Sequence, residues 1–191
     1  MPLTEYNFID ENPVDHIFYG RVAIKKANSF LFYIENGIVQ RIIHHLKYKN
    51  QQEIGSFLGD WYGQVLKEEN TLGHIDLIIP VPLHKKKLKK RGYNQVARFG
   101  ERLADHLNAI YTEGILVKTK NTRTQTRKNR IYRWQGDQDL YILSDPLFLK
   151  HKNVLLVDDV ITTGATLEAC AKVLQKAEGV NIYIATMAVV P

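Results

Sequence analysis

The chain has 191 residues, of which 45% are hydrophobic and 24% are charged, and its formal net charge is +6. This composition is typical of a globular protein, and the length suits one α/β domain better than two. No apolar run approaches the ~20 residues that a membrane-spanning helix needs. The polar, acidic N-terminus is unlike a signal peptide, and the single cysteine, Cys170, excludes an internal disulfide and a cysteine metal cluster. We therefore expect a cytoplasmic protein without a membrane partner.

The basic residues are concentrated in two segments. Six lie between His84 and Arg91 and seven between Lys118 and Arg133, with no acidic residue in either segment. Together the segments hold 13 of the 26 lysines and arginines, so acidic residues outnumber basic ones in the rest of the chain. Two basic segments on an acidic body indicate an anionic ligand, either a phosphorylated small molecule or a nucleic acid.

The N-terminal part of the chain predicts a hairpin followed by helices. Two aromatic and β-branched runs, 17–24 and 29–34, favour a β-hairpin. Apolar residues at helical spacing begin after Gly37, and a wide apolar face over 54–66 predicts a longer helix. We expect these elements to form an N-terminal region, residues 1–70, beside the main sheet.

From residue 75 onward, strands alternate with helices. Apolar runs predict buried strands at 75–81, 115–117, 154–157 and 182–190. Between them lie a basic loop at 84–92 and amphipathic helical patterns over 96–107 and 167–174. This alternation predicts an α/β fold, a doubly wound and mainly parallel sheet with helices on both faces. The whole chain, 1–191, is expected to be a single domain with its sheet core in 75–191.

The stretch VLLVDDVITTGAT, residues 154–166, combines a buried strand with an anion site. The strand ends on Asp158 and Asp159, which places two carboxylates at the edge where open α/β sheets bind ligands. The next residues offer three hydroxyls and successive backbone N–H groups, and a helix begins near Thr166. Carboxylates that can hold hydroxyls, beside a loop that can hold a phosphate, indicate a sugar phosphate as the ligand.

This stretch resembles the phosphoribosyl pyrophosphate binding motif of type I phosphoribosyltransferases at all thirteen positions. The resemblance implies that Asp158 and Asp159 are catalytic residues that approach the ribose 2- and 3-hydroxyls, directly or around Mg²⁺. It also implies that the 5-phosphate is enclosed by Thr162, Thr163, Gly164, Ala165 and Thr166.

Outside this motif, the chain resembles the ComF family of phosphoribosyltransferase-like proteins, which includes competence-associated and GntX-like members. The matching segments are LKYK at 46–49, IIPVPLHKKKLKKRGYNQ at 78–95 and a T-x-x-Q with following Arg and Asn at 122–130. The resemblance extends over residues 15–191. Members of this family commonly carry an N-terminal four-cysteine zinc module; this chain has none, so zinc is not predicted, and the module is either lost or absent from the chain as given.

The resemblance also assigns positions for the leaving pyrophosphate. In type I enzymes the loop after the first core strand holds it, and Val81, Pro82, Leu83 and His84 occupy that position here, with Arg91 following. A second loop closes over the reacting centre and corresponds to 118–135. Positive side chains could neutralise pyrophosphate there, and the candidates in this loop are Arg123, Arg127 and Arg130, of which Arg127 is taken as catalytic.

Two functions stay open. In the first, the protein is an enzyme that binds phosphoribosyl pyrophosphate and Mg²⁺ and transfers phosphoribosyl to an unidentified nucleophile with release of pyrophosphate. In the second, it is a non-catalytic or regulatory nucleotide-binding module whose basic segments contact single-stranded DNA or a helicase partner in DNA uptake. Tyr93, beside the first basic segment, could stack on a base or serve only in packing. The sequence determines neither the acceptor nor the oligomeric state.

Overall fold

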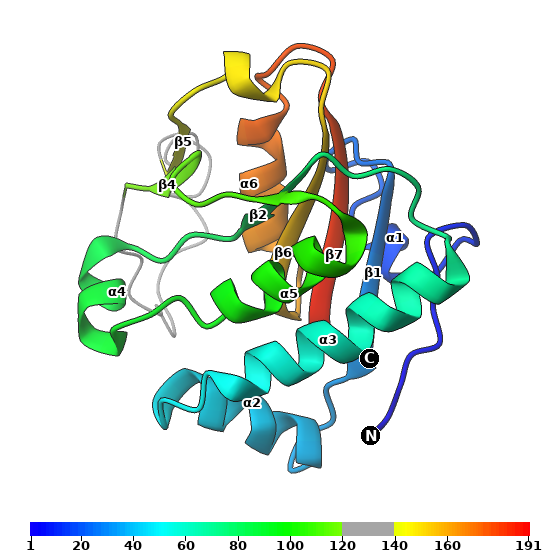
Figure 1. Ribbon diagram of the computed structural model, residues 1–191, viewed down its shortest axis with the longest axis vertical. Coiled ribbons are helices and arrows are strands. Elements are labelled where there is room, and N and C mark those ends of the chain that lie inside the picture. Colours follow the sequence, from blue (N-terminus) through cyan, green and yellow to red (C-terminus); the bar gives the residue numbers. More distant parts are fainter. Residues whose placement is uncertain (120–139) are drawn as a thin grey trace.

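The computed structural model describes residues 1–119 and 140–191, and its centre is a five-stranded sheet in the order β1-β7-β6-β2-β3 (Figure 1). Every neighbouring pair of these strands is parallel. The strands, in the order of the sheet, are β1 (Lys26–Phe32), β7 (Asn181–Val189), β6 (Asn153–Ile161), β2 (Leu77–Pro80) and β3 (Ile110–Tyr111). The prediction of an α/β fold with a mainly parallel sheet is confirmed.

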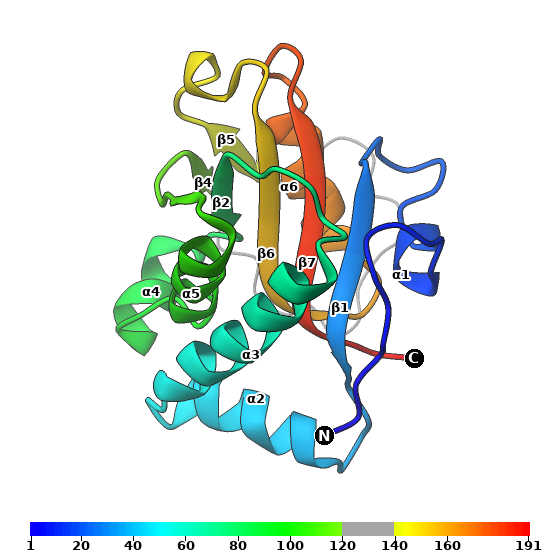
Figure 2. The same ribbon diagram turned by 45° about the vertical axis from the view of Figure 1, so that its right-hand side comes forward.

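Helices cover both faces of this sheet, as predicted. Figure 2 shows α3 and α5 in front of the sheet and α6 behind it. In β6, Leu155 and Val157 pack with the first group of helices, and Val154 and Leu156 pack with the second. This alternation is the period of two that a strand requires, and it explains why the run is apolar throughout. The first group is α2 (Ile38–Tyr48), α3 (Glu53–Glu69) and α5 (Ala97–Leu107); the second face carries α1 (Pro13–His16) and α6 (Ala165–Leu174).

The predicted N-terminal hairpin is wrong. Residues 17–24 form turns and irregular backbone, and β1 pairs in parallel with the last strand, from Lys26↔Tyr183 to Phe32↔Val189. The apolar residues of 17–24 pack against the core instead of pairing with β1; Phe18 is fully buried. β1 thus belongs to the central sheet, although it lies in the segment assigned to the N-terminal region.

The segment predicted as a basic loop contains a helix, α4 (Lys85–Arg91). His84 caps it, since its Nδ1 accepts a hydrogen bond from the Lys86 backbone N–H at 3.2 Å, and Gly92 ends it at a φ of 87°. None of the residues of α4 is buried. The segment therefore has no apolar periodicity from which a helix can be predicted.

The strand predicted at 115–117 forms, but outside the central sheet. It is β4 (Leu116–Lys118), which pairs antiparallel with β5 (Tyr141–Leu143) in a separate two-stranded sheet. The strand that pairs with β2 is β3, which is only two residues long and is not buried on either side. A short 3-10 helix, Leu147–Leu149, leads into β6. Within the described residues, no helix combines the length and the apolar content needed to cross a bilayer.

Candidate functional site

The carboxyl ends of β6 and β2 lie where the order of the strands reverses. From β2 the chain continues to β3 on one side, whereas from β6 it continues to β7 on the other. Open α/β sheets bind their ligands in the crevice at this switch point. Both predicted ligand loops, 81–84 and 162–166, leave the sheet here. The topology therefore places the two loops side by side.

Asp158 and Asp159 lie within β6 instead of ending it, because the strand continues to Ile161. β2 pairs with β6 only up to Pro80↔Val157. The acid pair consequently begins one residue beyond the last partner in β2, where that side of β6 is no longer covered by a strand. Both aspartates are buried, with 8% and 5% of their surface exposed.

Asp159 is held by two segments from the face with α2 and α5. The Gln95 side-chain amide donates to Asp159 Oδ2 at 2.7 Å, and the Lys47 ammonium lies 3.0 Å from Oδ1. The Arg91 guanidinium in turn donates to Gln95 Oε1. Arg91, predicted for the pyrophosphate, is therefore connected to the acid pair through Gln95. No sequence pattern predicts a role for Lys47 or Gln95, although they lie in the LKYK and RGYNQ segments that carry the family resemblance.

Asp158 has few positive charges near it. Burial, and then repulsion from Asp159, raise the pKa of Asp158 to about 7. The backbone N–H of Asp159, which donates to Asp158 Oδ1 at 2.9 Å, and the ammonium groups of Lys47 and Lys118 act in the opposite direction. Lys118 is on β4, so the two aspartates interact with elements of opposite faces of the sheet. The buried pair is short of positive charge.

A Mg²⁺ ion fits this pair of carboxylates. Mg²⁺ prefers oxygen ligands and is commonly held by one or two carboxylates together with substrate oxygens and water. Among the described residues, no group of three or more His, Cys, Asp or Glu could form a complete metal site. Of the described residues, Asp158 and Asp159 would hold the ion, and a bound ligand and water would supply further oxygens.

The threonine loop after β6, residues 162–166, is open to solvent on one side and packs against the N-terminal segment on the other. Thr162, Thr163, Ala165 and Thr166 are exposed, whereas Gly164 is buried. Gly164 caps α6 with a φ of 71°, and a Cβ added there would lie 2.5 Å from Ile17 Cγ2. The first N–H groups of a helix have no partner within it, so the start of α6 has the backbone geometry that the predicted anion site requires.

Arg21 fixes this loop to the N-terminal segment. Its guanidinium donates to the Thr163 carbonyl at 2.8 Å and to Glu168 Oε2 on α6 at 2.9 Å. No local pattern in the sequence indicates this contact, because Arg21 and Thr163 are far apart in the chain. The turn that replaces the predicted hairpin thus holds the threonine loop and the start of α6 in place.

The predicted pyrophosphate loop lies next to the acid pair. Val81 is buried, its N–H donates to the Val157 carbonyl at 2.8 Å, and its carbonyl accepts from the Asn94 amide at 3.1 Å. Pro82, Leu83 and His84 are partly exposed. The structure brings this loop, Arg91 and the acid pair together. Arg127, with Arg123 and Arg130, lies outside the described residues, as does nearly all of 118–135.

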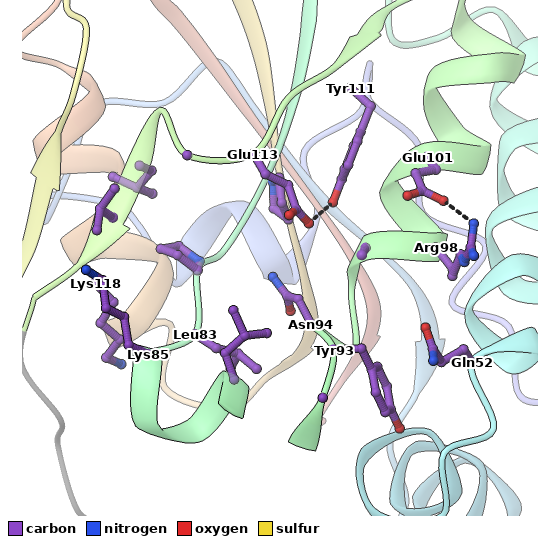
Figure 3. Close-up of a pocket in the computed structure, with 18 residues that line it drawn as sticks. Gln52, Leu83, Lys85, Tyr93, Asn94, Arg98, Glu101, Tyr111, Glu113 and Lys118 are labelled. Carbon is purple, nitrogen blue, oxygen red and sulfur yellow. Dashed lines mark hydrogen bonds and ion pairs between the residues drawn. The ribbon is translucent and has the colours of Figure 1, made fainter. Parts of the chain in front are cut away.

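A large cavity lies beside this site and does not include it. Its volume is about 840 Å³, and its lining contains Pro82 and Leu83 but neither aspartate nor the threonine loop. Figure 3 shows Lys85 and Lys118 at one end of the cavity. At the other end lie two hydrogen-bonded pairs, Tyr111 with Glu113 at 2.6 Å and Arg98 with Glu101 at 2.9 Å. The carboxylates that could bind Mg²⁺ and the predicted phosphate loop therefore lie outside this cavity.

The fold and the site define a phosphoribosyltransferase-like protein of type I. The sequence profile of the phosphoribosyl transferase domain family matches residues 96–190. The chain is 31% identical over 139 residues to competence protein F of Haemophilus influenzae, which covers 71% of this chain and 61% of that protein. It is 30% identical to DNA utilization protein YhgH of Escherichia coli, over 70% of this chain and 59% of that protein. It is 31% identical to competence protein ComFC of Streptococcus pneumoniae, over 52% of this chain and 41% of that protein.

The chain belongs to the ComF family of phosphoribosyltransferase-like proteins. It spans less than two thirds of the length of each of these three relatives.

Proposed function

We propose that the protein binds phosphoribosyl pyrophosphate with Mg²⁺ at the carboxyl end of β6 and transfers phosphoribosyl to a nucleophile. The observation that carries this proposal is the buried pair Asp158 and Asp159, short of positive charge and followed at the end of β6 by the exposed threonine loop. A ribose 5-phosphate fits both halves of this arrangement. Its 5-phosphate suits the N-terminus of α6, and its hydroxyls suit the carboxylates.

In this proposal the chain acts by positioning and by neutralising charge. The threonine loop, 162–166, binds the 5-phosphate, and Asp158 and Asp159 orient the ribose. Bound Mg²⁺ would supply positive charge to the pyrophosphate oxygens. Arg91, which Gln95 holds beside the acid pair, stabilises the charge that develops on the leaving group. The bond from C1 to the pyrophosphate oxygen breaks, and its electron pair leaves with the pyrophosphate. The nucleophile bonds to C1, and the proton of the nucleophile passes to solvent.

Calorimetry tests this proposal. Phosphoribosyl pyrophosphate is titrated into the protein with and without Mg²⁺, and Asp159→Asn is compared with Asp105→Asn, which changes an exposed carboxylate of α5. We expect Mg²⁺-dependent binding that Asp159→Asn weakens at least tenfold and that Asp105→Asn leaves unchanged. Equal affinity in the wild type and Asp159→Asn would contradict the proposal. A screen for pyrophosphate release with candidate acceptors then tests turnover.

A second function is favoured by the surface of α4. This helix presents six lysines and arginines, and five of them are exposed. The relatives named for competence and DNA utilization agree with a protein that contacts single-stranded DNA or a helicase partner during DNA uptake. Binding to single-stranded DNA should then fall steeply as the salt concentration rises. Absence of any affinity at low salt would contradict this second function.

A further inference from the structure

We propose that the pocket between α2 and α4 binds a nucleotide beside the proposed donor site. That the neighbouring site is a donor site rests on the proposed function; the binding of a nucleotide does not. The α2–α4 pocket has a volume of about 370 Å³, within the range of small-molecule sites. It is lined by Lys47, Tyr48, Asn50, Lys87, Lys90, Arg91 and Tyr93.

The charges of the α2–α4 pocket call for an anion. Four of its seven lining residues are lysine or arginine, and none is acidic. Among the described residues, no carboxylate pairs with Lys87, Lys90 or Arg91. Burial, and then the charges of Arg91 and Lys47, lower the pKa of Lys87, so these cations repel one another. A phosphate group would remove this repulsion and accept hydrogen bonds from several of them.

The aromatic residues of the pocket favour a phosphate that carries a base. Tyr48 is 65% exposed, and the Arg91 guanidinium lies 5.6 Å from the centre of its ring. The Tyr93 hydroxyl donates to the Leu46 carbonyl, which holds this second ring in place against α2. Tyrosine rings and a guanidinium plane are surfaces on which nucleobases stack. A nucleotide therefore matches the pocket better than inorganic phosphate does.

Lys47 makes the pocket a neighbour of the donor site. Its ammonium lies 3.0 Å from Asp159 Oδ1, and the same side chain lines the α2–α4 pocket. This pocket therefore shares a wall with the proposed donor site. A ribose hydroxyl or a cation that binds Asp159 would displace the Lys47 ammonium. The positive charge of Lys47 would then be available to an anion in the pocket.

Two double variants of α4 test the proposal with the same change of charge. Lys87→Gln with Lys90→Gln removes two cations that line the pocket, whereas Lys86→Gln with Lys89→Gln removes two that do not. Adenosine 5′-monophosphate is titrated into protein that is already saturated with ribose 5-phosphate, which fills the donor phosphate loop and has no leaving group. We expect the first pair to weaken binding at least tenfold and the second pair less than threefold.

The base is tested at Tyr48. We expect Tyr48→Leu to weaken the binding of adenosine 5′-monophosphate about tenfold and Tyr48→Phe to restore it, because stacking needs the ring and not the hydroxyl. A short 5′-phosphorylated oligothymidylate, used in the same titration, shows whether the nucleotide is free or at the end of a strand. If the Lys87/Lys90 variant alone loses binding of either ligand, the result supports nucleotide binding in the α2–α4 pocket. The ligand that binds more tightly shows whether the pocket prefers a free nucleotide or the end of a strand.

The outcomes separate this inference from the proposed function. No binding of adenosine 5′-monophosphate or of the oligonucleotide, or equal losses in the two double variants, would overturn the inference. Phosphoribosyl pyrophosphate affinity, measured in the same variants, should stay within about threefold of the wild type. If phosphoribosyl pyrophosphate does not bind at all while the pocket still binds a nucleotide, the proposed function fails and nucleotide binding at α2–α4 stands.

Discussion

The Lys47 ammonium on α2 lies 3.0 Å from the Asp159 carboxylate on β6, and this contact joins the N-terminal helices to the acid pair. The Asp159 side chain is only 7% exposed and that of Lys47 is 25% exposed. A buried carboxylate needs such a partner, since an unpaired charge is costly in the interior. In the proposed function, a ribose hydroxyl or Mg²⁺ uses the oxygen that Lys47 contacts in the ligand-free protein.

Replacement of Lys47 by methionine should therefore destabilise the ligand-free protein. Because Asp159 then keeps, among the described residues, only its bond from Gln95, we expect the free energy of unfolding to fall by about 1–3 kcal/mol. Urea denaturation measures this difference, and Mg²⁺ should reduce it by replacing the lost positive charge. Lys49→Met, at the exposed end of the same helix, is the matched control and should change stability little. Equal stability of Lys47→Met and the wild type would contradict this role.

Asp158 should cost the ligand-free protein stability at neutral pH. Burial and the repulsion from Asp159 raise its pKa to about 7. A carboxyl group whose pKa is raised by folding makes its largest contribution to the free energy of unfolding below its unfolded pKa of about 4. This contribution is lost as the pH rises through the folded pKa, here about 7. We expect Asp158→Asn to be more stable than the wild type at pH 8, by on the order of 1 kcal/mol or more.

Urea titrations from pH 4 to pH 8 test this expectation. The advantage of Asp158→Asn should be smallest near pH 4, grow up to about pH 7 and then level off. The same variant should bind phosphoribosyl pyrophosphate and Mg²⁺ more weakly, so that stability and binding change in opposite directions. A constant difference in stability across this pH range would contradict the raised pKa.

The stretch 154–166 could be predicted from sequence because all of its features are local. The run of buried residues, the adjacent aspartates and the glycine that begins α6 are neighbours in the chain, and their order reflects their order in space. The partner of β1 is different, since Lys26↔Tyr183 joins the two ends of the chain. Aromatic and β-branched residues indicate a strand but not which strand lies beside it. Composition therefore favours the nearest apolar run, 17–24, as the partner, whereas the actual partner lies at the far end of the chain.

Lys47 and Gln95 were missed for the same reason. Each reaches Asp159 from a segment distant in sequence, and a lone lysine or glutamine has no pattern that reveals such a contact. Their segments were marked by the family resemblance, which gave the location without the role. The helix α4 was missed because none of its residues is buried, so its lysines follow no apolar period.

Gly164 should not tolerate a side chain. Its φ of 71° is unfavourable for other residues, and a Cβ would lie 2.5 Å from Ile17 Cγ2. Backbone strain of about 1–2 kcal/mol and overpacking of about 1–3 kcal/mol predict a loss of roughly 2–5 kcal/mol for Gly164→Ala. Gly73 has nearly the same φ, 73°, with nothing within 4 Å of an added Cβ, so Gly73→Ala should lose only about 1 kcal/mol. Thermal and urea unfolding of the two variants measures the difference, and equal losses would show that contact with Ile17 is unimportant.

Asp76 stabilises the opposite end of the sheet, away from the proposed site. Its Oδ2 accepts the Asn153 backbone N–H at 2.8 Å and its Oδ1 lies 3.2 Å from the Lys152 ammonium, which ties the start of β2 to the start of β6. The hydrogen bond from Asn153 lowers the pKa of Asp76 most; burial opposes it, and the Lys152 ammonium lowers the pKa further. A carboxyl group with a lowered pKa contributes stability above its unfolded pKa, and this is lost as the pH falls through its folded pKa.

We therefore expect Asp76→Asn to reduce the free energy of unfolding by about 1 kcal/mol at pH 7, with a difference that shrinks at acid pH. Urea denaturation between pH 7 and pH 3 measures it, with Asp105→Asn as the exposed control. Phosphoribosyl pyrophosphate affinity should be unchanged, because Asp76 is at the amino end of β2 and the proposed site is at the carboxyl end. A loss of affinity as large as that of Asp159→Asn would mean that Asp76→Asn disturbs the whole sheet. It would contradict the inference that one end of β6 serves stability and the other end serves binding.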